Sequence, residues 1–168
     1  MNEGPPRESD WSKRDRRRIR LPRETYALEG STWHVTLATR QGISPLFEER
    51  ALRSRMVEVI DERCGIRGCV LHLSCVMPDH VHLLLEVGKD DLIAVIGDVK
   101  SCVAREWWGF GGERSPWQRR FYDRGVRTSR QFEEVVRYIL GNPVESGLCE
   151  DWEEYPYFSG VLLRSGDP

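Results

Sequence analysis

The stretch MPDHVHLLLEV, residues 77–87, decides the fold that we predict for this chain. Apolar residues alternate from Val81 to Val87, which predicts a β-strand because successive side chains of a strand point to opposite faces. His80 and His82 share the other face, although the chain of 168 residues has only four histidines. Two imidazoles at this spacing could hold one divalent ion or one anionic group. A pair of structural histidines would give the same pattern, so spacing alone leaves both readings open.

The segments around this strand predict a fold of one sheet with helices. Runs rich in β-branched and aromatic residues predict strands, and apolar residues at helical spacing predict helices. The predicted strands are residues 31–39, 69–77, 80–87 and 120–126, and the predicted helices are residues 44–63, about 91–107 and 128–141. This order favours the α+β class, with a ferredoxin-like split βαβ antiparallel sheet and helices on one face.

Capping residues and helix breakers set the predicted helix boundaries. Ser44-Pro45 predicts the start of the first helix and Gly65 its end, while Asp90 or Asp91 caps the second. Thr128 and Gln131 have the spacing of a capping box at the start of the last helix. Gly141-Asn142-Pro143 predicts where that helix ends.

Composition indicates a soluble globular protein with one domain. Charged residues make up 31% and hydrophobic residues 39% of the chain, and no apolar run approaches the roughly 20 residues of a membrane span. The N-terminus lacks the apolar segment of a secretory signal, so we expect a cytoplasmic protein. The predicted domain is residues 23–160, between a disordered basic arm (1–22) and a tail (161–168). Five cysteines without a CxxC pair indicate reduced, buried thiols rather than disulfides or a zinc site.

Basic residues gather in two stretches, although the net charge is -2. Most of them are arginine, which makes bidentate contacts with phosphate and stacks on bases. Arginines interleaved with aromatic residues favour nucleic-acid binding over a merely solvated face. The candidate contacts are Arg14, Arg17 and Arg18 in the arm, and Trp117, Arg119, Arg120, Tyr122 and Arg124 in the second stretch. For Trp117 a place in the core is the alternative.

Tyr138 lies off the apolar arc of the last helix. Asn142 follows it by one turn on the same side, so a hydroxyl and an amide could face a common site. A half-buried amphipathic tyrosine is the alternative reading. His34 and His72 have no partner in sequence, so we expect both to be structural, with His72 the more buried.

Together these motifs resemble a known family. His-x-His after a short turn, WQRRFYDRGVR (117–127) and RYILGNPVESGL (137–148), followed by WEEYPYFSG (152–160), is similar to the REP-associated tyrosine transposases of the HUH superfamily. The resemblance covers roughly residues 24–160 and implies the HUH nuclease fold with a C-terminal catalytic helix. It implies that His80 and His82 are metal ligands, that Tyr138 is the catalytic tyrosine and that Asn142 is a third ligand.

The resemblance also implies a reaction. A transposase of this kind nicks and rejoins single-stranded DNA beside a hairpin through a 5′-phosphotyrosine, assisted by Mg²⁺ or Mn²⁺, and works as a monomer or homodimer. Neutral imidazoles, an amide oxygen and a tyrosine hydroxyl agree with that chemistry. A domesticated protein that binds DNA or RNA hairpins without cutting them remains an alternative. A nucleotide hydrolase with alternating histidines is disfavoured, because Leu84 stands where a third histidine is needed.

Overall fold

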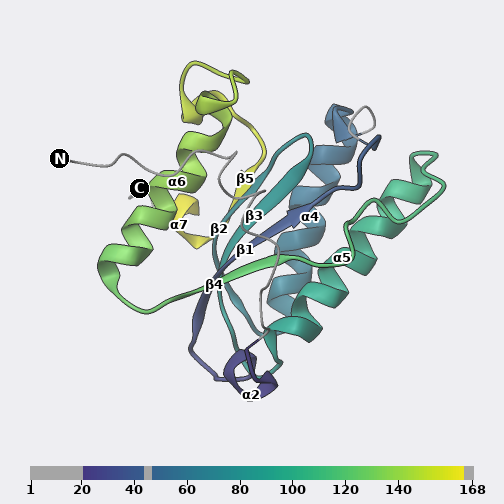
Figure 1. Ribbon diagram of the computed structural model, residues 1–168. Coiled ribbons are helices and arrows are strands. Elements are labelled where there is room, and N and C mark those ends of the chain that lie inside the picture. Colours follow the sequence, from purple (N-terminus) through teal and green to yellow (C-terminus); the bar gives the residue numbers. More distant parts are fainter. Residues whose placement is uncertain (1–20, 44–46, 165–168) are drawn as a thin grey trace.

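The computed structural model describes residues 21–43 and 47–164. In these residues the chain forms an antiparallel sheet of five strands in the order β4-β1-β3-β2-β5 (Figure 1). The strands are β1 (Thr32–Ala38), β2 (Val70–Val76), β3 (His80–Glu86), β4 (Tyr122–Val126) and β5 (Phe158–Ser159). The helices are α2 (Arg23–Tyr26), α4 (Arg50–Ile66), α5 (Leu92–Gly109), α6 (Ser129–Glu145), the 3₁₀ helix η1 (Trp152–Glu154) and α7 (Val161–Arg164).

The connections confirm the predicted split βαβ arrangement. Helix α4 joins β1 to β2, which run parallel because each pairs antiparallel with β3 between them. Helix α5 joins β3 to β4, which pairs with the other side of β1. Helices α4 and α5 lie side by side on one face of the sheet, and α6 lies on the opposite face (Figure 1). The fold is therefore α+β, with α6 apart from the other two long helices.

Strand β3 is buried on both of its faces. Val81, Leu83 and Leu85 are fully buried on one face, as their alternation predicts. Leu84 is equally buried on the histidine face, because α6 covers that face. The two histidines of β3 therefore lie inside the protein rather than on a solvated surface.

The boundaries of α4 differ from the prediction. The predicted start at Ser44-Pro45 lies outside the described residues, and α4 begins at Arg50, where Glu49 accepts a hydrogen bond from the Ala51 N–H. The helix continues through Gly65 to Ile66. A glycine inside a helix costs about 1 kcal/mol but does not forbid the helical conformation, so it need not end the helix.

The predicted end of α6 is wrong in the same way. The helix begins as predicted, with the Thr128 hydroxyl accepting from the Gln131 N–H, but it runs through Pro143 to Glu145. Proline removes its own N–H donor and crowds the carbonyl of the preceding turn, which weakens a helix without always ending it. Here the Leu148 N–H still donates to the Pro143 carbonyl at 2.9 Å. The chain leaves the helix at Gly147, whose φ of +69° suits a residue without Cβ.

The C-terminal segment is packed against the sheet. Strand β5 pairs with β2, and α7 follows it against the same strand. The structure therefore includes residues 161–164 of the predicted tail in the fold, while residues 165–168 lie outside the described part. Gly160 makes this packing possible, because a Cβ there would lie 2.4 Å from the His72 carbonyl oxygen.

The relative burial of two histidines contradicts the prediction. His34 in β1 is 6% exposed, whereas His72 in β2 is only partly buried. Burial lowers the pKa of His34 to about 4, with smaller contributions from the charges of Arg124 and His80. His34 is therefore neutral at neutral pH.

Two predictions from composition can also be compared with the structure. None of the helices in the described ranges is long and apolar enough to cross a membrane. All five cysteines lie in those ranges; they form no disulfide, and four of them are buried. The prediction of reduced, mostly buried thiols agrees with this arrangement.

Replacement of Gly160 tests the packing of the C-terminal segment. Its φ of +129° is a conformation that L side chains rarely adopt, and an added Cβ would clash with backbone atoms of β2. We expect Gly160→Ala to lower the free energy of unfolding by about 3 kcal/mol in urea denaturation. Gly147→Ala is the matched control, because its Cβ would meet open space and should cost only about 1 kcal/mol. Equal losses in the two variants would contradict the close approach.

The buried imidazole of His34 predicts a pH dependence of stability. Its folded pKa of about 4 lies below the ordinary 6.5, so the unfolded chain binds a proton in this window that the folded chain does not. The free energy of unfolding should therefore fall as the pH drops from about 6.5 to about 4, by up to about 3 kcal/mol. His34→Gln should reduce that fall, measured by urea denaturation across the window. His72→Gln should change it less because His72 is more exposed, and an unchanged pH dependence in His34→Gln would contradict the prediction.

Candidate active site between the sheet and helix α6

The strand register gathers polar side chains on the face that α6 covers. In β1, His34 lies opposite Leu84 of β3, and Thr36 lies opposite His82. On the other side of β1, Tyr122 of β4 lies opposite Thr36 and Arg124 lies opposite His34. Paired residues of antiparallel strands share a face. Residues distant in sequence therefore meet beside the two histidines of β3.

The two histidines of β3 point one nitrogen each at the same place. The Nε2 atoms of His80 and His82 are 2.9 Å apart. Two ligand nitrogens that each lie about 2.1 Å from one ion, about 90° apart, are separated by about 3 Å. The pair is therefore already spaced to share one divalent ion.

Asp79 controls the other nitrogen of His80. The Nδ1 atom lies 2.6 Å from Asp79 Oδ1, and the hydrogen bond with His80 is the main reason that the pKa of Asp79 is lowered. Thr39 holds the Asp79 backbone in place, since its N–H and hydroxyl both donate to the Asp79 carbonyl, at 2.8 and 2.9 Å. A carboxylate at Nδ1 favours the tautomer with its proton on Nδ1, which leaves Nε2 as the ligand atom.

Strand β1 supplies the corresponding contacts to His82. Its Nδ1 atom lies 3.2 Å from Thr36 Oγ1 and 3.2 Å from His34 Nε2. The His82 side chain is 2% exposed, and its pKa lies well below 6.5, mainly through burial and then through the charges of His80 and His34. His82 is therefore neutral, as an imidazole must be to bind a metal ion.

Helix α6 brings Tyr138 and Asn142 to the same histidines. Its buried residues Val135 and Ile139 fix the face that packs on the sheet. The Tyr138 ring lies edge-on to His82, with 5.3 Å between ring centroids and an interplanar angle of 76°. Asn142 is buried one turn later, so both side chains that the sequence singled out reach the site.

The orientation of Asn142 suits a ligand. Its Nδ2 atom donates to the Tyr138 carbonyl at 2.9 Å, which turns Oδ1 toward other partners. Asn142 is also the neighbour that raises the pKa of His82, as an accepting oxygen does. The Asn142 side chain therefore lies close to the His82 imidazole.

These donors fit the divalent ion that the resemblance implies. Nε2 of His80, Nε2 of His82 and Oδ1 of Asn142 would give two nitrogens and one oxygen, with other positions open to substrate or water. Within the described part of the chain, no three side chains of histidine, cysteine, aspartate or glutamate form a metal-binding group. An amide as third ligand is consistent with that finding. His34 does not join the ligands, because its Nε2 faces the Nδ1 atom of His82.

The other predicted DNA contacts fall in three places. Tyr122 and Arg124 lie at the site, with the Tyr122 ring 6.1 Å from His34. Arg119 and Arg120 are exposed in the segment that leads from α5 to β4. Trp117 is 2% exposed, and its indole N–H donates to the Lys100 carbonyl at 2.9 Å. Its ring is therefore a core element and is not available to stack on a base.

Three predicted DNA contacts are not described by the structure, and three residues near the histidine pair were not predicted to belong to the site. Arg14, Arg17 and Arg18 lie outside the described residues. His34 and Thr36 became site residues only through the register of β1 against β3, which a single strand does not reveal. Asp79 had a signal in the sequence, since it directly precedes the first histidine of the pair.

Comparisons with known proteins show the family to which the chain belongs. A family model described as "Transposase IS200 like" matches residues 29–142. A REP-associated tyrosine transposase of Escherichia coli (strain K12) is 26% identical over 136 residues, which cover 79% of this chain and 78% of that protein. A putative REP-associated tyrosine transposase of Haemophilus influenzae is 33% identical over 97 residues, which cover 51% of this chain and 55% of that relative.

A solved structure shows the same fold. It is a REP-associated tyrosine transposase bound to a REP hairpin, with a TM-score of 0.65 and 22% identity, and the match covers 84% of this chain and 81% of that one. The resemblance noted from the motifs is thus confirmed in sequence and in fold. The family match spans β1 to α6 and includes the two histidines, Tyr138 and Asn142. The chain therefore belongs to the IS200-like transposase family.

Proposed function

We propose that this chain is a metal-assisted enzyme that nicks single-stranded DNA and transfers the cut strand. One observation carries the proposal: Tyr138 packs edge-on against His82 at 5.3 Å, one helical turn before Asn142 and beside the converging Nε2 atoms. A nucleophile beside a place for a metal ion is the combination that this kind of phosphoryl transfer needs.

The tyrosine would carry the covalent step. The Tyr138 phenolic oxygen attacks the scissile phosphorus, and the bond from phosphorus to the 3′ oxygen breaks. The leaving 3′ oxygen takes up a proton, so the products are a 5′-phosphotyrosine and a free 3′-OH. The reverse attack by a 3′-OH rejoins a strand without another energy source. The polarity of this cut follows from the family resemblance.

The histidines and Asn142 would hold Mg²⁺ or Mn²⁺. Such an ion lowers the charge on the phosphate oxygens and stabilises the charge that develops in transfer. With Asp79 accepting the His80 proton at Nδ1 and Thr36 accepting the corresponding proton of His82, both Nε2 lone pairs would be free to hold the ion. These contacts make Asp79 and Thr36 positioning residues rather than catalytic ones.

DNA hairpins are the proposed partner. The fold relative described above was solved with a REP hairpin, and Tyr122 and Arg124 line the site in this chain. Arg119 and Arg120 are exposed next to β4, where they could contact the backbone of the same strand. The proposal also assigns backbone contacts to Arg14, Arg17 and Arg18 of the N-terminal arm.

One chain contains all the proposed catalytic parts. Tyr138 contacts the histidines of its own chain, at 5.3 Å from His82 and 5.8 Å from His34 between ring centroids. This geometry supports the proposal that a monomer performs the cut, rather than a homodimer that exchanges α6. Binding of a hairpin without cleavage is the second candidate function, and the assay below separates the two.

The covalent intermediate is the direct test of Tyr138. A single-stranded DNA hairpin with a labelled flank is incubated with the protein and Mn²⁺, and the products are separated on a denaturing gel. We expect a protein–DNA adduct from the native protein and none from Tyr138→Phe, because this change removes the attacking oxygen and retains the ring. Tyr157→Phe is the matched control and should form the adduct.

Replacement of a proposed ligand separates cutting from binding. His80→Ala should abolish the adduct and leave hairpin affinity within about 3-fold of the native value, because imidazole and metal are needed for chemistry more than for docking. Equal loss of cleavage and binding would point to a structural histidine. An adduct that persists in Tyr138→Phe would contradict the assignment of the nucleophile.

The positioning role of Asp79 predicts a change in metal affinity. Loss of the partner that orients a ligand typically weakens metal binding by about 10- to 100-fold, so we expect Asp79→Ala to weaken Mn²⁺ binding by that factor in calorimetry without DNA. Asp79→Asn should recover part of the affinity, because its amide oxygen can accept the same N–H. Glu86→Gln, at the far end of β3, is the control and should bind Mn²⁺ normally. Native affinity in Asp79→Ala would contradict the role.

A further inference from the structure

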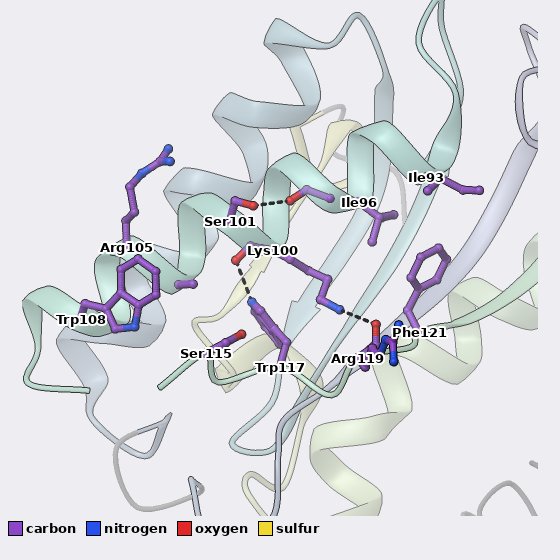
Figure 2. A pocket seen from close by; sticks show the side chains of 12 residues that line it. Ile93, Ile96, Lys100, Ser101, Arg105, Trp108, Ser115, Trp117, Arg119 and Phe121 are labelled. Carbon is purple, nitrogen blue, oxygen red and sulfur yellow. Dashed lines mark hydrogen bonds between the residues drawn. The ribbon is translucent and has the colours of Figure 1, made fainter. Parts of the chain in front are cut away.

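We propose that a groove on the outer side of α5 binds the single-stranded DNA that leaves the active site. The groove has a volume of about 520 Å³ and lies between α5 and the segment of residues 115–121 (Figure 2). It is on the face of the sheet opposite to the histidines, and none of His80, His82, Tyr138 and Asn142 lines it. The inference takes single-stranded DNA from the proposed function and adds a second place on the protein that holds it.

Two aromatic rings lie at opposite ends of the groove. Trp108, in the last turn of α5, is 50% exposed, and Phe121, just before β4, is partly buried. Figure 2 shows Lys100 between these two rings. An exposed ring such as that of Trp108 can stack on unpaired bases of any sequence, because every base has an aromatic face.

The charge of the groove is complementary to a phosphate backbone. Lys100, Arg105 and Arg119 line it, and none of the described residues that line it is acidic. The Lys100 ammonium donates to the Gln118 and Arg119 carbonyls at 2.8 and 3.4 Å, which holds the side chain at the groove. Positive charge thus gathers here in a chain whose net charge is -2.

Arginines at the junction of α4 and α5 behave differently. Arg63 and Arg67 pair with Asp98, and Arg55 pairs with Glu106. Arg105 instead donates to the Cys102 sulfur at 2.8 Å, and the ion pairs among the described residues include neither Arg105 nor Arg119. The guanidinium groups of the groove are therefore available for phosphate.

The groove is connected to the active site by an edge strand. Phe121 and Tyr122 are neighbours in sequence, and they point to opposite faces of the sheet, Phe121 into the groove and Tyr122 toward His34. Strand β4 is the last strand on that side of the described sheet. A DNA strand that passes Tyr122 can therefore cross the edge of β4 and enter the groove past Arg119. This continuity favours DNA over an acidic peptide as the occupant.

Binding of oligothymidylate tests the groove without a hairpin. A labelled oligothymidylate of about 12 nucleotides, within the usual range for a single-strand binding site, is titrated with the full-length protein by fluorescence anisotropy. We expect Trp108→Ala to weaken binding by about 5- to 150-fold, the range for loss of one base stack. Arg105→Ala should reduce the slope of log affinity against log salt by about 0.7, as expected for one lost phosphate contact. Phe110→Ala is the control, because this ring is also exposed but does not line the groove.

A cross-link identifies where the DNA lies. Oligothymidylate carrying 5-iodouracil is irradiated with the protein, and the modified peptides are identified by mass spectrometry. We expect a cross-link at Trp108 or Phe121. Unchanged affinity in Trp108→Ala, together with cross-links elsewhere, would overturn the proposal. An acidic peptide would then be the next ligand to test in this groove.

The result is distinguishable from a failure of the proposed function. If the groove binds DNA and the catalytic assignment is wrong, Trp108→Ala weakens oligothymidylate binding although no covalent adduct forms with any hairpin. If the catalytic assignment is right and the groove is not a DNA site, the adduct forms, and the native protein and Trp108→Ala bind oligothymidylate with the same affinity. If both proposals are right, the native protein and Trp108→Ala should cut a hairpin without long flanks at the same rate.

Discussion

Thr36 of β1 lies opposite His82 of β3, and this register determines which side chains can surround the histidine pair. It places a hydroxyl and the His34 imidazole at Nδ1 of His82, each at 3.2 Å, while Nε2 turns toward His80. A slip of one residue would exchange the two faces of a strand. Val81 would then replace the histidines beneath α6, and neither the histidine pair nor the contacts that hold it would exist.

Burial then gives the polar cluster its chemical state. An unpaired polar group inside a protein is costly, so each imidazole nitrogen needs a partner. Asp79 satisfies His80, β1 satisfies His82, and Asn142 approaches from α6. The same burial lowers the pKa values of His34 and His82 and keeps both neutral. Helix α6 therefore both keeps these imidazoles neutral by burying them and brings Tyr138 next to His82.

The sequence predicted the parts of the site that lie within one element. The two-residue period of β3 identified the histidine pair, and the helical arc of α6 separated Tyr138 from the core. The sequence could not predict contacts between elements. The place of His34 in the site depends on the register of β1 against β3. The burial of Trp117 depends on how the segment after α5 folds back, so that its indole N–H meets the Lys100 carbonyl. Pro143 misled the prediction because its missing N–H does not prevent the next turns from forming.

The location of the covalent bond tests the central claim most directly, because Tyr122 also lies near the histidines, 6.1 Å from His34. After reaction with hairpin DNA and Mn²⁺, the protein is digested with trypsin and nuclease, and the peptide that carries the remaining nucleotide is sequenced by mass spectrometry. The account predicts modification at Tyr138, dependent on the divalent ion. Modification at Tyr122, or at a tyrosine remote from His80 and His82, would contradict it.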